Sequence, residues 1–485
     1  MKTRNLLLLI LLSLNLQLFA QTLSPDQLQA DFALFRKVLQ EVHPQMYRYT
    51  SKQQFDSLFA ATQACLNRPM TQHEFYKTML PLLVSLRDGH IKWIVSGKDE
   101  HYPFFTDSLF PLKLYFVGEK AWVAANYGDS QIPEGAELVS INGQSINSIK
   151  QTLFPNMTFS DGYTVQGKYE DLNHFFSGYY ATHYGAYATF DIVYTLNGEE
   201  KKATIPAVTE QQIKDYVQAH KPASQLPLRL AIDETKTAVL TIERFWDDKK
   251  EQKYKPFIKD AFRQLKKENI QHLILDVRNN EGGNEPFGVW LYSYLAKQPF
   301  RYYDHIKVAR KEKYSFHAWV PKIYTKVIRK YMLKKTDDGY VFTFPKGLKT
   351  SKPKRNAFGG DVYVLINGNS FSVTTEFSAR VHADGRATFV GQETGGGYRT
   401  NSSGMFTILQ LPHSKIDLGI PMFGFHMANV PDYIRHGQGI EPNHTIVPTI
   451  EDILTKKDPI LTFTRQLIQS KSTFAAPSSG PVPSK

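Results

Sequence analysis

Residues 362–385, VYVLINGNSFSVTTEFSARVHADG, decide how this chain is interpreted. The stretch begins as a short apolar run with β-branched residues, passes through Asn-Gly-Asn, and becomes helix-like from Val373 onward. It predicts a strand, a tight turn and a helix. Ser372 stands at the junction, where its hydroxyl would lie beside the N–H groups of a helix start, a place that favours negative charge. Ser372 is therefore a candidate nucleophile, although a serine at such a junction more often only caps the helix.

The composition is that of a large folded protein with an export signal. The chain has 485 residues, of which 42% are hydrophobic and 13% aromatic, so it can bury a large core in two or three domains. Residues 1–20 carry Lys2 and Arg4, then an apolar run that ends at Ala20. This is the pattern of a secretory signal, and it predicts a mature chain that begins near Gln21 and is periplasmic or extracellular. No later segment is long and apolar enough to predict a stable membrane span.

The cysteine content and the charge distribution limit which covalent links and which binding partners are expected. Cys65 is the only cysteine, so neither an intramolecular disulfide nor a lipid anchor at the cleavage point is expected. The net charge is +12, and residues 301–355 hold sixteen Lys or Arg against four Asp or Glu. Such a basic insertion suits anionic lipid, polysaccharide or acidic peptide, or it keeps a solvated loop soluble, or it covers a site as a lid. Nucleic acid is not an expected partner, because no binding module is recognisable.

The N-terminal part reads as helices. Helical spacing starts after Ser24 and recurs over 52–66 and 72–86, the last of these opened by Thr71 as N-cap. Pro81 predicts a kink or break in the third helix. That helix stops at Arg87-Asp88-Gly89-His90, with the glycine in a C-cap position, so that His90 is presented from a turn. A lone histidine in such a turn is more often a surface or capping residue than a catalytic one.

The middle of the chain reads as short strands. From about residue 103 to 209 the runs LKLYFV, AWVAAN, ELVSING, ATFDIVYTL and KATIPAV alternate with turns. Residues 132–143, IPEGAELVSING, resemble the glycine turn, strand and Asn-Gly hairpin of a PDZ domain, which binds an extended peptide at a sheet edge. A small structural β domain is the alternative interpretation.

From Leu228 the pattern changes to alternating strands and helices. TAVLTIERF is a predicted strand, 255–269 an amphipathic helix, and HLILDVRNNEGGN a buried strand that runs into a glycine turn. Further helix is predicted over 287–296 and further strand over 386–391. This alternation predicts a mixed or parallel sheet. A final helix is expected through Leu467, and the Ser- and Pro-rich residues 470–485 are expected to be a disordered tail.

Five motifs in order resemble one family. They are LRDGH (86–90), LILDVRNNEGG (273–283), NGNSFSVTTEF (367–377), DGRATFVGQETGGG (384–397) and GIEPN (439–443). Together they are similar to the C-terminal processing and tricorn-like serine peptidases. The resemblance implies a multi-domain α+β chain with a crotonase/ClpP-like α/β core and hydrolysis of peptide or protein substrates. The implied organisation is a signal peptide (1–20), an N-terminal helical region (21–100), a PDZ-like domain (103–215) and a peptidase domain (225–468) with the basic insertion 301–355.

One departure from the family bears on mechanism. The processing branch uses a Ser-Lys dyad, and Gly397 stands where its lysine is expected. The resemblance to the tricorn-like branch instead implies a histidine from the N-terminal region, which is His90 here. A serine hydroxyl is a poor nucleophile at neutral pH and needs a base, and histidine suits that task. His90 is therefore the expected general base for Ser372.

The remaining site residues follow from the reaction and from the resemblance. The tetrahedral oxyanion needs fixed N–H donors, and the expected donors are Gly282, Gly283 and Val373. The resemblance implies a late glutamate as third catalytic member, for which Glu441 fits best. Its alternative is a surface turn residue, in which case Asp88 would fix the turn that carries His90.

Three further residues are assigned to substrate binding, and one ion pair to the loop. Glu376 either binds the substrate amine or buttresses the turn, and Gly396 and Gly397 belong to the glycine-rich loop. Asp276 and Arg278 are expected to form a buried ion pair that shapes the oxyanion loop rather than to do chemistry.

Two other functions remain compatible with the sequence. The first is a non-catalytic protein that binds a peptide or apolar ligand on the same fold, and the second is a hydrolase of non-peptide esters or amides. No histidine cluster has metal-ligand spacing and no glycine fingerprint for phosphate is present, so neither a metal nor a cofactor is expected.

Overall fold

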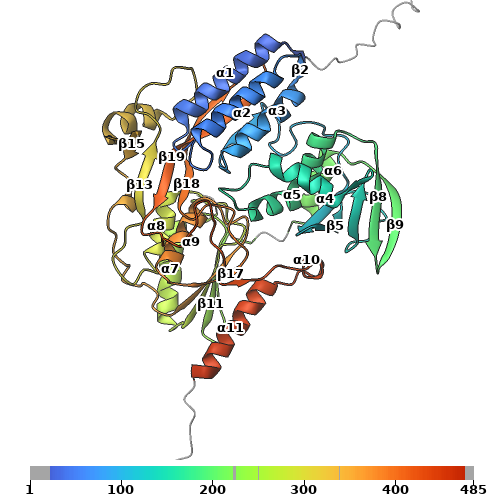
Figure 1. The fold of residues 1–485 in the computed structure, drawn as a ribbon. Helices are drawn as coiled ribbons and strands as arrows, with labels where there is room; N and C mark the ends of the chain where they lie inside the picture. The colour runs from blue at the N-terminus through green and yellow to red at the C-terminus, as the bar shows by residue number, and fades with distance from the viewer. Residues whose placement is uncertain (1–21, 222–224, 249–250, 338, 476–485) are drawn as a thin grey trace, which may run out of the picture.

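The computed structural model describes residues 22–221, 225–248, 251–337 and 339–475. The predicted signal peptide and the end of the predicted tail lie outside these residues. Figure 1 shows a bundle of N-terminal helices above a large mixed α/β body, with a separate β-rich part beside both. The mixed α/β class expected from the sequence is confirmed.

Three helices form the N-terminal bundle. They are α1 (Pro25–Val42), α2 (Lys52–Cys65) and α3 (Gln72–Ser85), and a short ladder of β1 (Thr22–Leu23) with β2 (Met70–Thr71) joins their ends. Thr71 caps α3 as predicted. The helix continues through Pro81, however, so the predicted break is absent. Pro81 is exposed while Leu82 and Leu83 are buried, so its ring faces water and the buried face holds the helix together.

The β-rich part has a hydrophobic core of its own. Its sheet has the order β4-β5-β6-β8-β9, with β7 paired to β6. The strands are β4 (Leu112–Val117), β5 (Lys120–Asn126), β6 (Glu137–Ile141), β7 (Gln144–Ser145), β8 (Thr189–Leu196) and β9 (Glu199–Pro206). The helices are α4 (Ile146–Leu153), η1 (Phe154–Asn156), α5 (Gln166–Tyr184) and α6 (Glu210–Ala219). The strand pattern expected here is confirmed, whereas α5 was not predicted.

The sheet formed by strands between residues 228 and 445 carries the Ser372 unit. Its order is β10-β11-β12-β16-β17-β20, antiparallel at the first pair and parallel at the others. The strands are β10 (Leu228–Ile232), β11 (Thr237–Ile242), β12 (His272–Asp276), β16 (Asp361–Ile366), β17 (Thr388–Gly391) and β20 (His444–Thr445). The helices α7 (Tyr254–Lys267), α8 (Glu285–Tyr292) and α9 (Val373–Ala383) share the large core on one face. The mixed sheet predicted from the alternating pattern is confirmed.

The other face of this sheet is covered by the C-terminal helix α11 (Pro459–Ala475), whose Ile460 and Ile468 pack on Tyr363 and Leu365. The short α10 (Ile450–Thr455) has no buried residue and contacts β5 of the β-rich part. Because α11 continues to Ala475, the prediction that the disordered tail begins at residue 470 is wrong for its first six residues. Arg278, at the end of β12, joins Asp276 to Asp458 at the start of α11. No helix among the described residues has the length and apolarity that crossing a bilayer requires.

A second sheet links the N-terminal bundle to the part of the chain that carries Ser372. Its order is β14-β15-β13-β19-β18, with β3 also paired to β19. The strands are β3 (Lys92–Val95), β13 (Tyr303–Val308), β14 (Leu333–Thr336), β15 (Gly339–Phe342), β18 (Thr400–Gln410) and β19 (Ile416–Met427). The basic insertion therefore supplies three strands, together with the π-helical segment η2 (Tyr324–Met332) and the short η3 (Lys346–Leu348).

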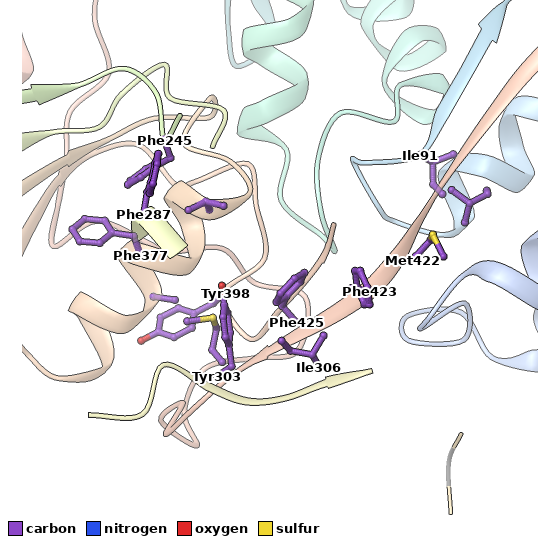
Figure 2. Packing of buried hydrophobic residues seen from close by; sticks show 14 of the residues in the cluster. Ile91, Phe245, Phe287, Tyr303, Ile306, Phe377, Tyr398, Met422, Phe423 and Phe425 are labelled. Atoms are coloured by element: carbon purple, nitrogen blue, oxygen red, sulfur yellow. The ribbon is translucent and has the colours of Figure 1, made fainter. Parts of the chain in front are cut away.

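One continuous core runs along β19. Figure 2 shows Met422, Phe423 and Phe425 spaced along this strand, with Tyr303 beside Phe425 and Ile91 near the other end. The Tyr303 and Phe425 ring centroids are 5.1 Å apart. Residues of α1 and α3 belong to the same buried cluster as β12, β16 and α9. The N-terminal bundle and the part of the chain that carries Ser372 thus pack as one unit, which fixes the segment that carries His90.

Candidate active site

Ser372 occupies a strained position between β16 and α9. Its backbone angles are φ 55° and ψ −126°, a region that non-glycine residues rarely adopt. Its side chain makes no capping hydrogen bond to the helix, so the simple capping interpretation does not describe it. Strain of this kind persists only where the surrounding structure imposes it, and it gathers at functional sites. The hydroxyl is left available at the start of α9.

His90 reaches Ser372 from the end of α3. Arg87 has φ 51°, so it takes the left-handed position that was predicted for Gly89. Gly89 serves a different purpose: a Cβ there would lie 2.6 Å from Phe371 Cζ and 3.1 Å from Ser160 N. The imidazole of His90 stacks on the Phe371 ring at a centroid distance of 4.6 Å. Phe371 directly precedes Ser372, so this stack places the histidine ring against the residue next to the serine.

Ser372 and His90 line the same pocket. It has a volume of about 500 Å³. Its lining includes Gly283 and Asn284 of the glycine turn and Lys346 and Gly347 of the insertion. The apolar side chains that line it are Val289, Phe342, Met405, Phe406, Phe423 and Phe425. The structure thus unites the serine, the histidine and the glycine turn, which are distant in sequence, around one largely apolar space.

A buried Asp88 faces the histidine. Its Oδ1 lies 3.8 Å from His90 Nδ1 and accepts the His90 backbone N–H at 3.0 Å. Its Oδ2 lies 3.0 Å from His43 Nε2. The Gln45 N–H donates to His43 Nδ1, so His43 carries its proton on Nε2 and donates it to Asp88. Asp88 therefore fixes the turn that carries His90, as the second of the two interpretations proposed.

Burial and these contacts determine the protonation states of His90 and Asp88. Burial lowers the pKa of His90 to about 4, although the negative charge of Asp88 opposes the shift. Burial would raise the pKa of Asp88, but the hydrogen bond and charge of His43 together lower it below its usual range. The site at neutral pH is therefore an ionised Asp88 beside a neutral imidazole. Nδ1 of His90 is buried without a hydrogen-bond partner, which leaves Nε2 as the nitrogen for the pocket.

The place expected for a catalytic lysine is filled by a second carboxyl group. Gly397 donates its N–H to Asp161 Oδ2 at 3.2 Å, and Gly89 donates to Asp161 Oδ1 at 2.9 Å. A Cβ on Gly397 would lie 3.0 Å from Thr400 O and 3.5 Å from Tyr49 Oη. Burial and the neighbouring charge of Asp88 raise the pKa of Asp161 to about 7. Asp161 thus ties the histidine turn to the glycine-rich loop.

The three expected oxyanion donors differ in availability. The Gly282 N–H donates to Asn280 Oδ1 at 2.9 Å, so it is already engaged. In the described part of the chain, neither the Gly283 nor the Val373 N–H has an acceptor. A Cβ on Gly282 would lie 2.7 Å from Ser372 Cβ, which shows how closely the glycine turn approaches the serine. Gly282 is therefore needed for that approach rather than as a donor.

The glycine turn and the Ser372 turn are held together by hydrogen bonds. Asn367 Oδ1 accepts the Asn279 N–H at 3.0 Å, and the Phe371 N–H donates to Asn280 O at 3.2 Å. Ser370 Oγ donates to Val277 O at 3.0 Å. Donors fixed in this way need no reorganisation when charge develops nearby, which is the property that an oxyanion hole requires.

Glu376 lies behind the pocket wall and does not line the pocket. It is 1% exposed and accepts hydrogen bonds from Tyr303 Oη at 2.5 Å and Asn401 Nδ2 at 2.7 Å. Burial, with the negative charge of Glu285, raises its pKa to about 7. Of its two expected roles, the geometry favours buttressing: Glu376 holds Tyr303, and Tyr303 lines the pocket.

Glu441 and Gly396 lie apart from the pocket lining. The Glu441 side chain is 59% exposed and its Oε1 is 3.7 Å from an Arg435 nitrogen. Gly396 packs on the helix that follows Ser372, where a Cβ would lie 2.3 Å from Thr375 Oγ1. For Glu441 the geometry matches the alternative of a surface turn residue, and the carboxylate beside His90 is that of Asp88. The roles of Gly396 and Gly397 are in packing and in binding Asp161.

Three residues of this site were not anticipated from the sequence: His43, Asp161 and Tyr303. None belongs to a motif, and each acts through a residue distant in sequence. Among the described residues, ligand atoms of Asp88, His90 and Asp161 lie within 4.8 Å of one another, the spacing of a possible metal site. Both oxygens of each carboxylate already accept N–H groups, so the hydrogen bonds account for this cluster.

Gly89→Ala should destabilise the protein through the clash at Phe371. The new Cβ would displace Phe371 or the Ser160 backbone, and overpacking of this kind costs about 1–3 kcal/mol of unfolding free energy. Urea unfolding measures the change. Gly359→Ala is the matched control, since a Cβ there has nothing within 4 Å. Equal stabilities of the two variants would contradict the close approach.

Glu376→Gln should change how stability depends on pH. The pKa of Glu376 is raised from 4.5 to about 7, so the stability that its protonated form contributes is lost as the pH rises through that window. The glutamine variant lacks this loss. Urea midpoints at the two ends of the window should therefore fall less for the variant than for the wild type. Glu441→Gln, at an exposed carboxylate, should behave like the wild type.

Comparison with known proteins indicates a serine peptidase, the class of enzyme that the sequence motifs resemble. Residues 236–446 match the model of peptidase family S41. The fold is similar to mature CPAF, with a TM-score of 0.62 and 14% identity over 94% of this chain and 99% of that chain. For mature CPAF complexed with lactacystin the values are 0.59 and 14% over 93% and 98%. The photosystem II D1 C-terminal processing protease gives 0.41 and 12% over 89% and 98%.

A search of curated proteins found no match. The two CPAF structures, at these identities, show a shared fold, and the family match over residues 236–446 supplies the class of chemistry. Residues 236–446 of this chain therefore belong to peptidase family S41, the tail-specific serine peptidases.

Proposed function

We propose that this chain is an exported serine peptidase in which His90 activates Ser372, as in the tricorn-like branch. The observation that carries the proposal is the common pocket of Ser372 and His90, with the glycine turn at its side. Export is supported by the basic, apolar and small-residue pattern of residues 1–20. Peptides or proteins are the substrates that the family implies.

The reaction begins with proton transfer from Ser372 to His90. Nε2 of the neutral imidazole takes the hydroxyl proton while Oγ attacks the scissile carbonyl carbon. The carbonyl oxygen becomes an oxyanion, which the N–H groups of Gly283 and Val373 stabilise; each donor contributes on the order of 3 kcal/mol. His90 then gives the proton to the leaving amine. Water repeats these steps in reverse order to release the acyl group.

Asp88 and His43 act on the histidine rather than on the substrate. The negative charge of Asp88 stabilises the imidazolium that forms when His90 takes the proton. His43 keeps Asp88 ionised by donating a hydrogen bond to its other oxygen. His43 is therefore a positioning residue. The burial of this chain of groups strengthens each interaction, because no water screens it.

The alternative Ser-Lys chemistry lacks a lysine at Gly397. The surroundings of that glycine, with Thr400 O and the Asp161 side chain close by, leave little space for a long side chain. The apolar lining of the pocket favours an apolar substrate residue beside the scissile bond. The PDZ-like pattern of residues 132–143 adds a second expected contact for an extended peptide.

Reaction with a fluorophosphonate probe tests the nucleophile and the base. Ser372→Ala should abolish labelling, and His90→Ala should slow it by on the order of 10³–10⁴-fold because the hydroxyl loses its base. Mass mapping of the labelled peptide identifies the site. Ser403→Ala is the control, since Ser403 is another hydroxyl of the same pocket. Labelling of folded protein at any serine other than Ser372 would overturn the assignment.

The pH dependence of labelling tests the histidine environment. Protonated His90 cannot accept a proton, so the rate should fall as the pH falls through about 4, the pKa of His90. Asp88 raises that pKa, so Asp88→Asn should move the midpoint to lower pH and also reduce the plateau rate. His73→Gln, at a histidine outside the pocket, should leave the profile unchanged. A wild-type midpoint near the ordinary histidine pKa would contradict the buried imidazole.

A further inference from the structure

The segment η2 of the basic insertion presents three rows of side chains. Tyr324 and Ile328 are buried, and the Tyr324 ring lies 6.1 Å from Phe423 of β19. This row anchors the segment to the sheet. Residues four apart lie on nearly the same face of a helix, so the positions before the anchored row form two more rows that face outward.

The outward rows have opposite character. Ile323, Val327 and Tyr331 form the apolar row, in which Ile323 is 50% and Tyr331 79% exposed. Lys322, Lys326 and Lys330, all exposed, form the cationic row beside it. We call these six residues the outer face of η2. An exposed apolar row beside a row of lysines is the pattern of helices that lie in the interface of a lipid bilayer.

A second exposed apolar group adjoins the start of this segment. Trp319 is 61% exposed and Ile408 43% exposed. The two residues exchange both backbone hydrogen bonds, Trp319 N to Ile408 O at 2.8 Å and Ile408 N to Trp319 O at 3.0 Å. Directly opposed residues of an antiparallel pair project their side chains to the same side. Trp319 therefore lies beside Ile408, and tryptophan favours the boundary between lipid and water.

The positive charge of the insertion also favours an anionic lipid surface as the partner. Sixteen Lys or Arg against four Asp or Glu give residues 301–355 a surplus equal to that of the whole chain. Arg310 is paired with Glu41 and Glu312. Across the described residues, the three lysines of the outer face have no acidic partner. Unpaired lysines beside exposed apolar groups match a surface that is both anionic and apolar within a few ångströms.

We propose that the outer face of η2, with Trp319 and Ile408, binds the surface of an anionic lipid bilayer. Lysines contact the phosphate headgroups while the apolar row and the indole enter the interface. An acidic peptide or polysaccharide would satisfy the lysines but would leave the exposed apolar side chains without a purpose. The insertion also gives Phe342 and Lys346 to the Ser372 pocket, so docking would hold that pocket close to the membrane surface.

Vesicle flotation tests the proposal with the chain that begins at Gln21. The probes are vesicles of phosphatidylcholine mixed with phosphatidylglycerol, vesicles of phosphatidylcholine alone, and soluble polyglutamate. The protein should float with the mixed vesicles only, and less so as salt is raised, because salt screens the lysines. Binding to polyglutamate without binding to mixed vesicles, equal binding to both vesicle types, or no binding to any probe would overturn the proposal.

Two variants separate the charged and apolar contributions. Changing Lys322, Lys326 and Lys330 to Gln should weaken binding to mixed vesicles on the order of a hundredfold. Ile323→Ser with Tyr331→Ser retains the charge and should weaken binding about tenfold or more. Changing the exposed Lys201, Lys202 and Lys267 to Gln is the charge-matched control, and it should have little effect. If the control variant lost as much vesicle binding as the variant of the outer face, the loss would be due to net charge alone. That result would contradict binding through a specific face.

Catalysis is not needed for this binding. Ser372→Ala should float like the wild type, and the lysine variants should keep their reaction with the fluorophosphonate probe. A lysine variant that lost both properties would be tested for folding by urea unfolding. Lost flotation with intact folding supports the proposal whatever the activity.

Discussion

The structure depends on the pairing of β3 with β19. Four residues of the N-terminal region, Lys92–Val95, pair in antiparallel fashion with residues 416–419 of β19. Strand β18 pairs with residues 417–426 of β19, and β13 pairs with residues 424–427. His90 lies two residues before β3, so this register determines where the imidazole stands. Without it, the histidine would belong to a turn at the end of a surface helix. The pairing holds the histidine in a fixed position, and this lowers the conformational entropy that would have to be lost before the proton transfer that we propose.

A second constraint is the dry network beneath the histidine. Two carboxyl groups, those of Asp88 and Asp161, are buried close together, and their environments separate their pKa values. His43 lowers the pKa of Asp88, whereas burial and the charge of Asp88 raise the pKa of Asp161 to about 7. Like charges this close do not both ionise easily, so one group carries the charge and the other binds backbone N–H groups. The ionised carboxylate of Asp88 lies beside His90. Asp161, whose pKa of about 7 leaves it partly protonated at neutral pH, holds the histidine turn against the glycine-rich loop.

Local patterns predicted much of the fold. The helix starts at Ser24 and Thr71, the alternating strands of the β-rich part and the strand-turn-helix around Ser372 all form as their residues indicate. Failures occur where packing overrides the pattern. Helix α5 is buried on several sides and contains Gly167, Gly178 and a kink at Phe175, so no amphipathic period marks it. Pro81 is tolerated because it faces water, and Arg87 rather than Gly89 takes the left-handed turn position.

The sequence by itself indicated most of the elements, the order of the motifs and the two principal residues of the proposed site, Ser372 and His90, because these depend on neighbouring residues and on a resemblance along the chain. Only the tertiary structure decided which groups surround them. His43 and Asp161 became partners of Asp88 and Gly397, Glu376 turned inward to Tyr303, and Glu441 lay exposed beside Arg435. These outcomes rest on long-range contacts and on burial, which sets both hydrogen-bond partners and pKa values, and neither is encoded in any short stretch of sequence.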